Sequence, residues 1–260
     1  MNEIISLKNI SAYRGDTLAL ENITLTLKLG EHVAILGPNG SGKSTLIKLI
    51  TREVYPVHKQ ESSIRIFGKE HVDIWELRKK IGMVSADYQN DYKSLATGLD
   101  VVVSGFFGSV GIHGHQTVTS DHLDRAKEVM ADLEISYLED AQYLKLSTGQ
   151  QRRLLLARAL VRNPKILLLD EPSNGLDIQA RFWLLRTLRK LAQTGTTIVC
   201  VTHELHELIP EIDRVVLLKQ GQVIADGPKL IHLNSANLCE LFETNLKLIY
   251  EEGHIQAFPT

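Results

Sequence analysis

The sequence predicts an α/β fold built on a mostly parallel sheet. The apolar run Val33–Leu36 leads through a glycine-rich turn into a helix-like segment. A second run, Ile166–Leu169, is apolar at every position, as in a strand buried on both faces. A third, Gly195–Thr202, is rich in β-branched residues. Such strands, alternating with helix-patterned segments, are typical of a parallel sheet covered by helices.

Composition limits the possible classes of protein. With 260 residues the chain can form one large domain, or a core with a subdomain. Its 43% hydrophobic and 23% charged residues are ordinary for a globular protein. A net charge of −2 gives no overall basic excess, so no nucleic-acid partner is expected. The two cysteines, Cys200 and Cys239, predict no disulfide framework and fit a reducing compartment.

Short strands open the chain. Ile4–Leu7 and Leu25–Leu29 have strand patterns, and turn signals stand at Gly15-Asp16 and at Leu29–Glu31. Tyr13 precedes the glycine-rich turn. From the residues alone it is either an aromatic packed at a strand end or a platform for a nucleotide base.

The segment G-P-N-G-S-G-K-S, residues 37–44, matches the P-loop pattern between a strand and a helix. Its glycines predict a tight turn whose N–H groups, with the helix dipole, favour a polyphosphate. Lys43 can reach the outer phosphates and Ser44 can bind Mg²⁺. The alternative, a turn that binds nothing, is disfavoured by this context. The predicted phosphate-binding residues are Gly37, Pro38, Asn39, Gly40, Ser41, Gly42, Lys43, Ser44 and Thr45.

The middle of the chain predicts two more strands, Ser63–Gly68 and Ile81–Val84, separated by a short helical segment, Trp75–Lys80. Recurrent glycines predict that regular helix is interrupted across residues 90–120. Asp121–Leu133 has the spacing of a helix with one buried face.

Histidines in two places invite a metal interpretation. His113, His115 and His122 cluster in the glycine-rich region, but without supporting cysteines or carboxylates they are predicted to be loop histidines. His203 and His206 are three residues apart, whereas the zinc motif HExxH places its histidines four apart, so a zinc site is rejected.

The sequence L-S-T-G-Q, residues 146–150, precedes the helix-like run Gln151–Leu160. Ser147 is a natural N-cap. A capped helix start and a second phosphate-binding turn using Ser147 and the Gly149 backbone are equally compatible with the residues.

Two acids, Asp170 and Glu171, follow the buried strand. In an open parallel sheet, ligands bind at the carboxyl edge of the strands. There Asp170 can hold Mg²⁺ and Glu171 can polarise an attacking water. The alternative is a solvated charge pair, which the P-loop disfavours. His203 ends the next β-branched strand, where a polar side chain can reach a γ-phosphate.

The remaining chain is less informative. Residues 173–177 predict a turn before the helix Ile178–Leu191. Val215–Lys219 and Gln222–Asp226 predict a hairpin around Gly221. Residues 228–260 predict one helix and a tail, without recognisable chemistry.

Together these motifs resemble the ATP-binding cassette (ABC) ATPases across about residues 3–228. LSTGQQRR resembles the family's signature motif, with Thr148 where Gly is usual; KILLLDEP resembles its Walker B motif and SNGLD its D-loop. The resemblance implies a P-loop, RecA-like core with an N-terminal antiparallel β-subdomain and an inserted helical subdomain at about 88–160. It places the ATPase domain at 1–228 and a C-terminal helix and tail at 229–260.

The resemblance also implies ATP and Mg²⁺ as cofactors and a head-to-tail homodimer, in which each signature motif meets the partner's ATP. It assigns catalysis to Lys43, Glu171 and His203, Mg²⁺ to Ser44, Gln89 and Asp170, adenine stacking to Tyr13, and further nucleotide contacts to Ser147, Gly149, Gln150 and Asp177.

One position departs from the family pattern. The usual Q-loop glutamine is replaced by Ala86, and Gln89 is the nearest glutamine. Val84-Ser85 and residues 103–109 are similar to the molybdenum-linked, photorepair-type members.

The resemblance implies that the chain is the ATPase subunit of a transporter that imports a metal, an oxyanion or another solute. It also implies that the chain is held at the cytoplasmic face of the membrane by an integral-membrane permease. The longest apolar stretch, Val101–Ile112, is too short to span a bilayer. One alternative is a soluble ABC ATPase of DNA repair or translation, but the coiled coil, zinc-binding cysteines or second cassette usual in such proteins are not seen. Another is a small-molecule kinase, in which the LSTGQ and SNGLD segments would have no role.

Overall fold

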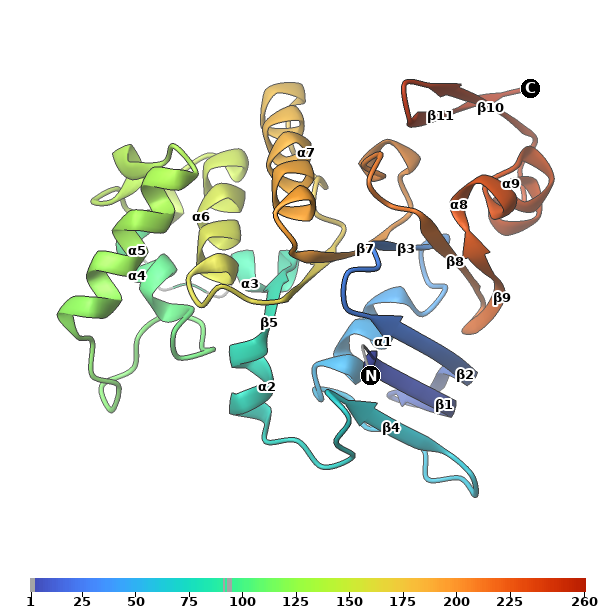
Figure 1. Ribbon diagram of the computed structural model, residues 1–260, viewed down its shortest axis with the longest axis horizontal. Helices are drawn as coiled ribbons and strands as arrows, with labels where there is room; N and C mark the ends of the chain where they lie inside the picture. Colours follow the sequence, from blue (N-terminus) through green and yellow to red (C-terminus); the bar gives the residue numbers. More distant parts are fainter. Residues whose placement is uncertain (1–2, 91, 93–94) are drawn as a thin grey trace. The chain divides into compact units, whose positions relative to one another are not determined.

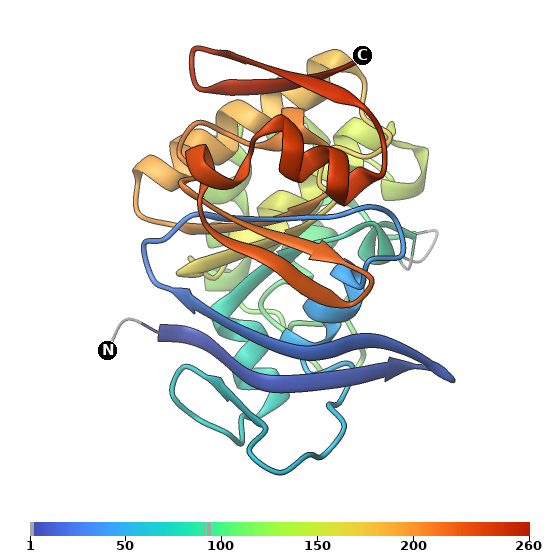
Figure 2. The same ribbon diagram turned by 90° about the vertical axis from the view of Figure 1, so that its right-hand side faces the viewer.

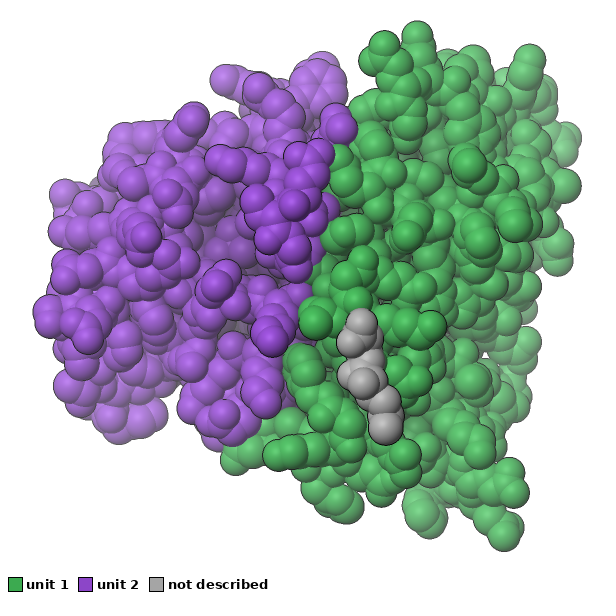
Figure 3. Space-filling model, viewed as in Figure 1, with its two compact units in different colours: residues 1–74, 197–260 green, residues 75–196 purple. Residues whose placement is uncertain are grey.

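The computed structural model describes residues 3–90, 92 and 95–260, which form both strands and helices (Figure 1). The chain divides into two compact units, coloured separately in Figure 3. Unit 1 comprises residues 1–74 and 197–260, and unit 2 comprises residues 75–196. Within the described residues no helix is both long and apolar enough to cross a membrane.

Unit 1 begins with an antiparallel sheet in the order β2-β1-β4. Its strands are β1 (Glu3–Arg14), β2 (Thr17–Lys28) and β4 (Ser63–Ile66). β1 and β2 run side by side (Figure 2) and are longer than predicted. Their pairing shifts register between Leu7 and Ile10 and again between Ile10 and Ala12. Such bulges break the two-residue alternation that reveals a strand in sequence.

The second sheet of unit 1 is centred on a fully buried strand, β3 (Val33–Leu36). β3 pairs in parallel with β7 (Thr197–Thr202) and β8 (Arg214–Lys219), and β8 pairs antiparallel with β9 (Gln222–Pro228). The predicted hairpin is therefore confirmed. α1 (Lys43–Ile50) follows β3, as the P-loop context requires.

The C-terminal segment contains more structure than one helix and a tail. α8 (Lys229–His232) and α9 (Ser235–Phe242) precede an antiparallel hairpin of β10 (Leu246–Glu251) and β11 (His254–Pro259). The hairpin turn, Glu252-Gly253, has positive φ at both residues, 49° and 81°. Two-residue turns of this kind usually carry Asn-Gly or Asp-Gly, so Glu-Gly gave a weak signal.

Unit 2 contains a parallel pair, β5 (Ile81–Val84) and β6 (Ile166–Asp170). Its helices are α2, which begins at the unit boundary (Ile74–Lys80), α3 (Ala86–Asn90), α4 (Gly98–Ser104), α5 (Ser120–Asp132), α6 (Thr148–Leu160) and α7 (Ile178–Gln193), with short 3-10 turns η1 (Ser136–Leu138) and η2 (Tyr143–Lys145). The helices predicted near α2, α5, α6 and α7 are confirmed.

Helix α4 is a short regular helix within residues 90–120, where the sequence predicts interrupted helix; residues 105–119 are irregular, as predicted. Thr97 and Asp100 form a reciprocal capping box at the start of α4. A Cβ at Gly98 would stand 2.1 Å from Leu138 O, and one at Gly105 would stand 2.2 Å from Arg158 O. Gly98 is the first residue of α4 and Gly105 is its C-cap, so these glycines permit close approach between segments of unit 2 at the two ends of the helix.

Candidate functional site

The loop between β3 and α1 is fixed at both ends by backbone hydrogen bonds within unit 1. Gly37 N donates to Thr202 O at the end of β7, at 3.3 Å. Gly221 N, in the β8–β9 turn, donates to Ser41 O at 2.9 Å. The neighbouring strands therefore determine the shape of the loop before any ligand is considered.

The three loop glycines are required for different reasons. Gly42 has a φ of 104°, and a Cβ there would stand 2.5 Å from Ala19 O of β2. Gly40 has a φ of 82° but open space around it. Gly37 has no left-handed φ; a Cβ there would stand 2.2 Å from Leu218 O. The predicted role of unusual φ values thus holds for Gly40 and Gly42, whereas Gly37 is needed for lack of space.

Positive charge and amide groups meet at the start of α1. The buried Lys43 ammonium donates to Gly37 O at 2.8 Å and to Pro38 O at 2.9 Å. Gly42, the N-cap of α1, offers no side chain to cap the first-turn amides. A helix start of this kind, next to an ammonium group, fits an anion such as a polyphosphate. Pro38 and Asn39 lie in the same loop, and Ser44 and Thr45 lie in the first turn of α1.

His203 lies close to this loop in unit 1. It follows Thr202, the residue that accepts the Gly37 hydrogen bond. Its Nε2 is 3.5 Å from Glu204 Oε1, and the other oxygen of Glu204 is 3.1 Å from His206 Nδ1. The structure therefore confirms that His203 stands at the carboxyl end of a strand beside β3.

Tyr13 is also on unit 1, near the end of β1. It pairs with Leu18 of β2 and its side chain is 50% exposed. Ala19, the next residue of β2, is the one that limits space at Gly42. A half-exposed ring on this part of the sheet is available for stacking, although packing alone would also explain an aromatic there.

The two acids lie at the end of β6 in unit 2, as predicted. Asp170 is the last residue of the strand, after three leucines with no exposed surface. Glu171 follows in a left-handed conformation with a φ of 46°. This conformation is uncommon for a residue with a side chain, and it ends the strand at this point.

Ser147 caps α6, which confirms that part of the prediction. Its hydroxyl accepts a hydrogen bond from Gln150 N at 3.3 Å, and Gln150 Oε1 accepts one from Ser147 N at 3.0 Å. This capping box satisfies two backbone donors and fixes the conformation of the turn. Gly149, between them, lies against α7.

Asp177 stands at the start of α7. Its carboxylate accepts a hydrogen bond from Ala180 N at 2.7 Å. In the turn before it, a Cβ at Gly175 would lie 3.8 Å from the Thr148 methyl group. The LSTGQ and SNGLD turns are therefore neighbours within unit 2, and Asp177 has a structural role whether or not it contacts nucleotide.

Gln89 lies on α3 in unit 2, and its amide is engaged. Gln89 Nε2 donates to Gln151 Oε1 at 2.8 Å, and Gln151 Nε2 donates to Tyr143 O at 3.0 Å. Its assignment to Mg²⁺ stays a prediction.

Three residues escaped the sequence reasoning. Gly221 supports the phosphate loop, Ala180 lies against Gly149, and Gln151 binds Gln89. Gly221 was identified only as a hairpin glycine. Each contact joins distant parts of the sequence, so local patterns carried no signal for any of them.

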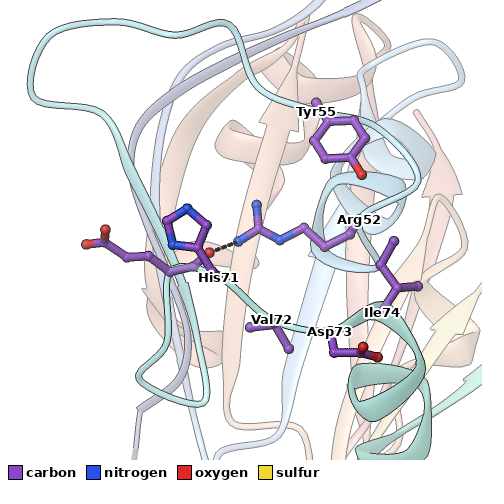
Figure 4. Close-up of a pocket in the computed structure, with 7 residues that line it drawn as sticks. Arg52, Tyr55, His71, Val72, Asp73 and Ile74 are labelled. Carbon is purple, nitrogen blue, oxygen red and sulfur yellow. Dashed lines mark hydrogen bonds between the residues drawn. The ribbon is translucent and has the colours of Figure 1, made fainter.

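Unit 1 also contains a pocket of about 380 Å³ (Figure 4). Arg52 reaches across it and donates to the Glu70 carbonyl at 2.9 Å, and burial lowers the pKa of this guanidinium. The lining residues are Arg52, Tyr55, Glu70, His71, Val72, Asp73 and Ile74. The pocket shares no residue with the predicted nucleotide site.

Comparison with known proteins decides the family. The family model described as ABC transporter matches residues 20–174, more than half of the chain. The chain belongs to the ABC transporter family. An uncharacterized ABC transporter ATP-binding protein of Bacillus subtilis, YlmA, is 31% identical over 96% of this chain and 94% of its own length. The hemin import ATP-binding protein HmuV of Hahella chejuensis is 29% identical over 92% of this chain and 93% of its own length.

Solved ABC structures agree with this family assignment. A dimeric structure of the ATP-binding cassette MJ0796, in a post-hydrolysis state bound to ADP and Pi, matches with a TM-score of 0.71 and 32% identity. The match covers 86% of this chain and 98% of that one. The protein is thus an ABC ATPase and the ATP-binding subunit of an ABC transporter. It has the P-loop fold, with the predicted antiparallel N-terminal sheet, that the sequence indicated.

Proposed function

We propose that this ABC ATPase pairs head to tail with a second copy around two Mg-ATP and couples hydrolysis to a membrane permease. The observation that carries the proposal is the fixed helix start at Ser147. The capping box engages the amides of Ser147 and Gln150 and holds the turn in place, and the amides of Thr148 and Gly149 lie between them at the N-terminus of α6, where an anion is favoured. The chain has one P-loop, so a second phosphate-binding turn calls for a phosphate held by another copy. The dimeric form of the related cassette supports this arrangement.

Each candidate residue has a role in this proposal. Lys43 and the amides of the loop and of α1 hold the phosphates, while Tyr13 stacks on adenine. A serine hydroxyl and a carboxylate are the hard oxygen donors that suit Mg²⁺, and Mg²⁺ neutralises phosphate charge during hydrolysis. Glu171 polarises the attacking water and His203 contacts the γ-phosphate. In this proposal Ser44 and Asp170 bind Mg²⁺, and Gln89, whose amide nitrogen donates to Gln151, is not among the ligands. The residues acting on the partner's nucleotide are Ser147, Gly149, Gln150 and Asp177.

The permease determines the solute, and import is the proposed direction. Two observations support import. One relative is named as a hemin import protein. In addition, the cassette lies on a chain in which no described helix could span a membrane. In this proposal the chain lies at the cytoplasmic face of the cell membrane, held there by the permease. Residues 1–228 form its ATPase domain, 88–160 the inserted helical subdomain, and 229–260 an appended C-terminal segment.

Size-exclusion chromatography with light scattering tests the pairing. With ATP and Mg²⁺, Glu171→Gln should accumulate as a dimer, because nucleotide binds but turnover is blocked. Lys43→Ala should stay monomeric under the same conditions, because the outer phosphates lose their ammonium partner. A Glu171→Gln chain that remains monomeric with saturating Mg-ATP would exclude the proposed sandwich. Hydrolysis stimulated by nucleic acid, with a steep salt dependence, would instead indicate an ABC ATPase of DNA repair or translation.

A further inference from the structure

The hydrogen bond between Gln89 and Gln151 joins the segment after β5 to the helix that carries the signature motif. Gln151 is the fourth residue of α6, directly after Gln150, which completes the capping box. Gln151 uses both ends of its amide: Oε1 accepts from Gln89 at 2.8 Å and Nε2 donates to Tyr143 O at 3.0 Å. The side chain of Gln151 is thus held between α3 and η2, immediately behind the signature turn.

Further contacts fasten the same segment to the helices of unit 2. The Arg158 guanidinium of α6 lies 4.7 Å from the centre of the Tyr88 ring, at cation–π distance. The Tyr92 hydroxyl is 3.1 Å from Ser104 Oγ of α4, and its ring centre is 4.8 Å from that of Tyr143. Tyr88, Gln89 and Tyr92 therefore each contact the helices or turns next to them. Gln89 is the one whose contact leads to the first turn of α6.

The position of Gln89 also argues against the Mg²⁺-binding role that the Q-loop glutamine usually has in this family. Ala86, where the family's glutamine usually stands, has a methyl group that cannot bind a metal ion. Gln89 lies three residues later, on the short helix α3, and its amide nitrogen is directed to Gln151. An amide held in this way restrains the helix to which it is bonded.

We propose that Gln89 is a positioning residue for the signature turn. Through Gln151 it fixes the position of the first turn of α6, so that the backbone N–H groups of the turn around Ser147 and Gly149 are oriented toward the partner's γ-phosphate. The inference rests on the proposed function, because the signature turn matters for turnover only in the nucleotide-bound dimer. A preorganised anion site loses transition-state stabilisation when its support loosens.

Steady-state ATP hydrolysis by Gln89→Ala, Gln151→Ala and the double variant tests the proposal. Each single variant should lower kcat by about 2- to 10-fold, the range expected for one hydrogen bond. The double variant should be no slower than the slower single variant, because both changes remove the same contact. The half-saturating concentrations of ATP and Mg²⁺ should not change. Gln256→Ala, on an exposed position of β11, is the matched control and should hydrolyse ATP normally.

Other outcomes would overturn the proposal. A Gln89→Ala chain with unchanged kcat, or additive losses in the double variant, would show that the two amides do not act together. A half-saturating Mg²⁺ concentration raised about tenfold or more in Gln89→Ala, with Gln151→Ala normal, would make Gln89 a metal ligand. The thermal unfolding midpoint of each variant should lie within about 2 °C of that of the unmodified chain, which shows that a lower kcat does not come from general destabilisation. Failure of the broader proposed function is distinguished by Glu171→Gln, which would then stay monomeric in the otherwise unmodified chain.

Discussion

Gly149 and Ala180 lie so close that no side chain fits between them: a Cβ on Gly149 would stand 2.8 Å from Ala180 Cβ. Gly149 is in the first turn of α6 and Ala180 in the first turn of α7. The helix that presents the signature turn therefore touches the helix that follows the SNGLD turn. The glycine is required here by its neighbour, in addition to any contact with nucleotide.

Gly149→Ala should therefore displace α6 from α7 and impair turnover. Overpacking of this kind costs about 1–3 kcal/mol of stability, and we expect ATP hydrolysis to fall about tenfold or more. The added variant Ala180→Gly removes the methyl group in conflict, so the double variant should recover most of the lost rate. Hydrolysis rates and thermal unfolding of the three variants check this. If Ala180→Gly gives no recovery, the requirement at position 149 is not steric.

The phosphate loop makes a second, graded prediction. Gly42→Ala combines a φ of 104° with a contact of 2.5 Å to the Ala19 carbonyl, which is backbone and cannot rotate away. It should abolish measurable ATP binding. Gly40→Ala meets open space at a φ of 82°, so only the left-handed conformation is penalised, by about 1–2 kcal/mol. Titration calorimetry with ATP should rank Gly40→Ala well above Gly42→Ala in affinity; equal losses would contradict the spatial argument.

A third prediction concerns the buried hydroxyl of Tyr143. It has no hydrogen-bond partner among the described residues, and burial raises the pKa of this phenol far above its ordinary value of 10.0. The folded state therefore favours the neutral phenol: stability is retained below the ordinary pKa and declines as pH rises beyond it. Tyr143→Phe removes an unsatisfied polar group, so it should be more stable by about 1–3 kcal/mol at neutral pH and should decline less above about pH 10.

Urea unfolding at neutral pH and above about pH 10 measures both effects. Tyr92→Phe is the matched control, because burial also raises the pKa of Tyr92 but its hydroxyl lies 3.1 Å from Ser104 Oγ. This control should lose about 1 kcal/mol at neutral pH, since it removes a made hydrogen bond. Destabilisation of Tyr143→Phe at neutral pH would show that its hydroxyl is satisfied.

Local signals in the sequence accounted for much of the fold and failed where long-range packing decides. β3 and the helix start at Ser147 were predicted because buried apolar runs and capping residues are short-range patterns. The glycines between residues 90 and 120 predict interrupted helix, but nothing in the sequence indicates that Gly98 and Gly105 also allow the ends of α4 to approach Leu138 and Arg158. A glycine needed for close approach looks the same in sequence as one needed for a turn.

The candidate site divides in the same way. The places of Lys43 at the start of α1 and of Glu171 directly after β6 could be predicted, because a glycine-rich P-loop pattern and a buried apolar run are local signals; their roles stay predictions. Their supports could not be predicted. Gly221 reaches the phosphate loop from a hairpin 180 positions later, and Gln151 meets Gln89 across 62 positions. No local pattern encodes such pairs, so only the folded chain reveals them.

The last prediction concerns the C-terminal hairpin, whose chemistry the sequence did not reveal. Ile255 is its buried residue, with 1% of its surface exposed, and β11 lies against η3 (Leu205–Glu207), two residues beyond His203. Ile255→Ala should lower the free energy of unfolding of this region by about 2–4 kcal/mol by leaving a cavity. Ile249→Ala, on the opposite strand with 47% of its surface exposed, should change it by less than about 0.5 kcal/mol.

Hydrogen exchange resolves where the loss occurs. In Ile255→Ala the amides of β10 and β11 should exchange faster. The amides of η3 should also exchange faster, because β11 would no longer pack steadily against them. The amides of β3 should keep their protection. Faster exchange confined to the hairpin would mean that it is an independent appendage. Faster exchange extending to η3 would mean that the C-terminal segment supports the backbone just after His203, because β11 lies against that turn.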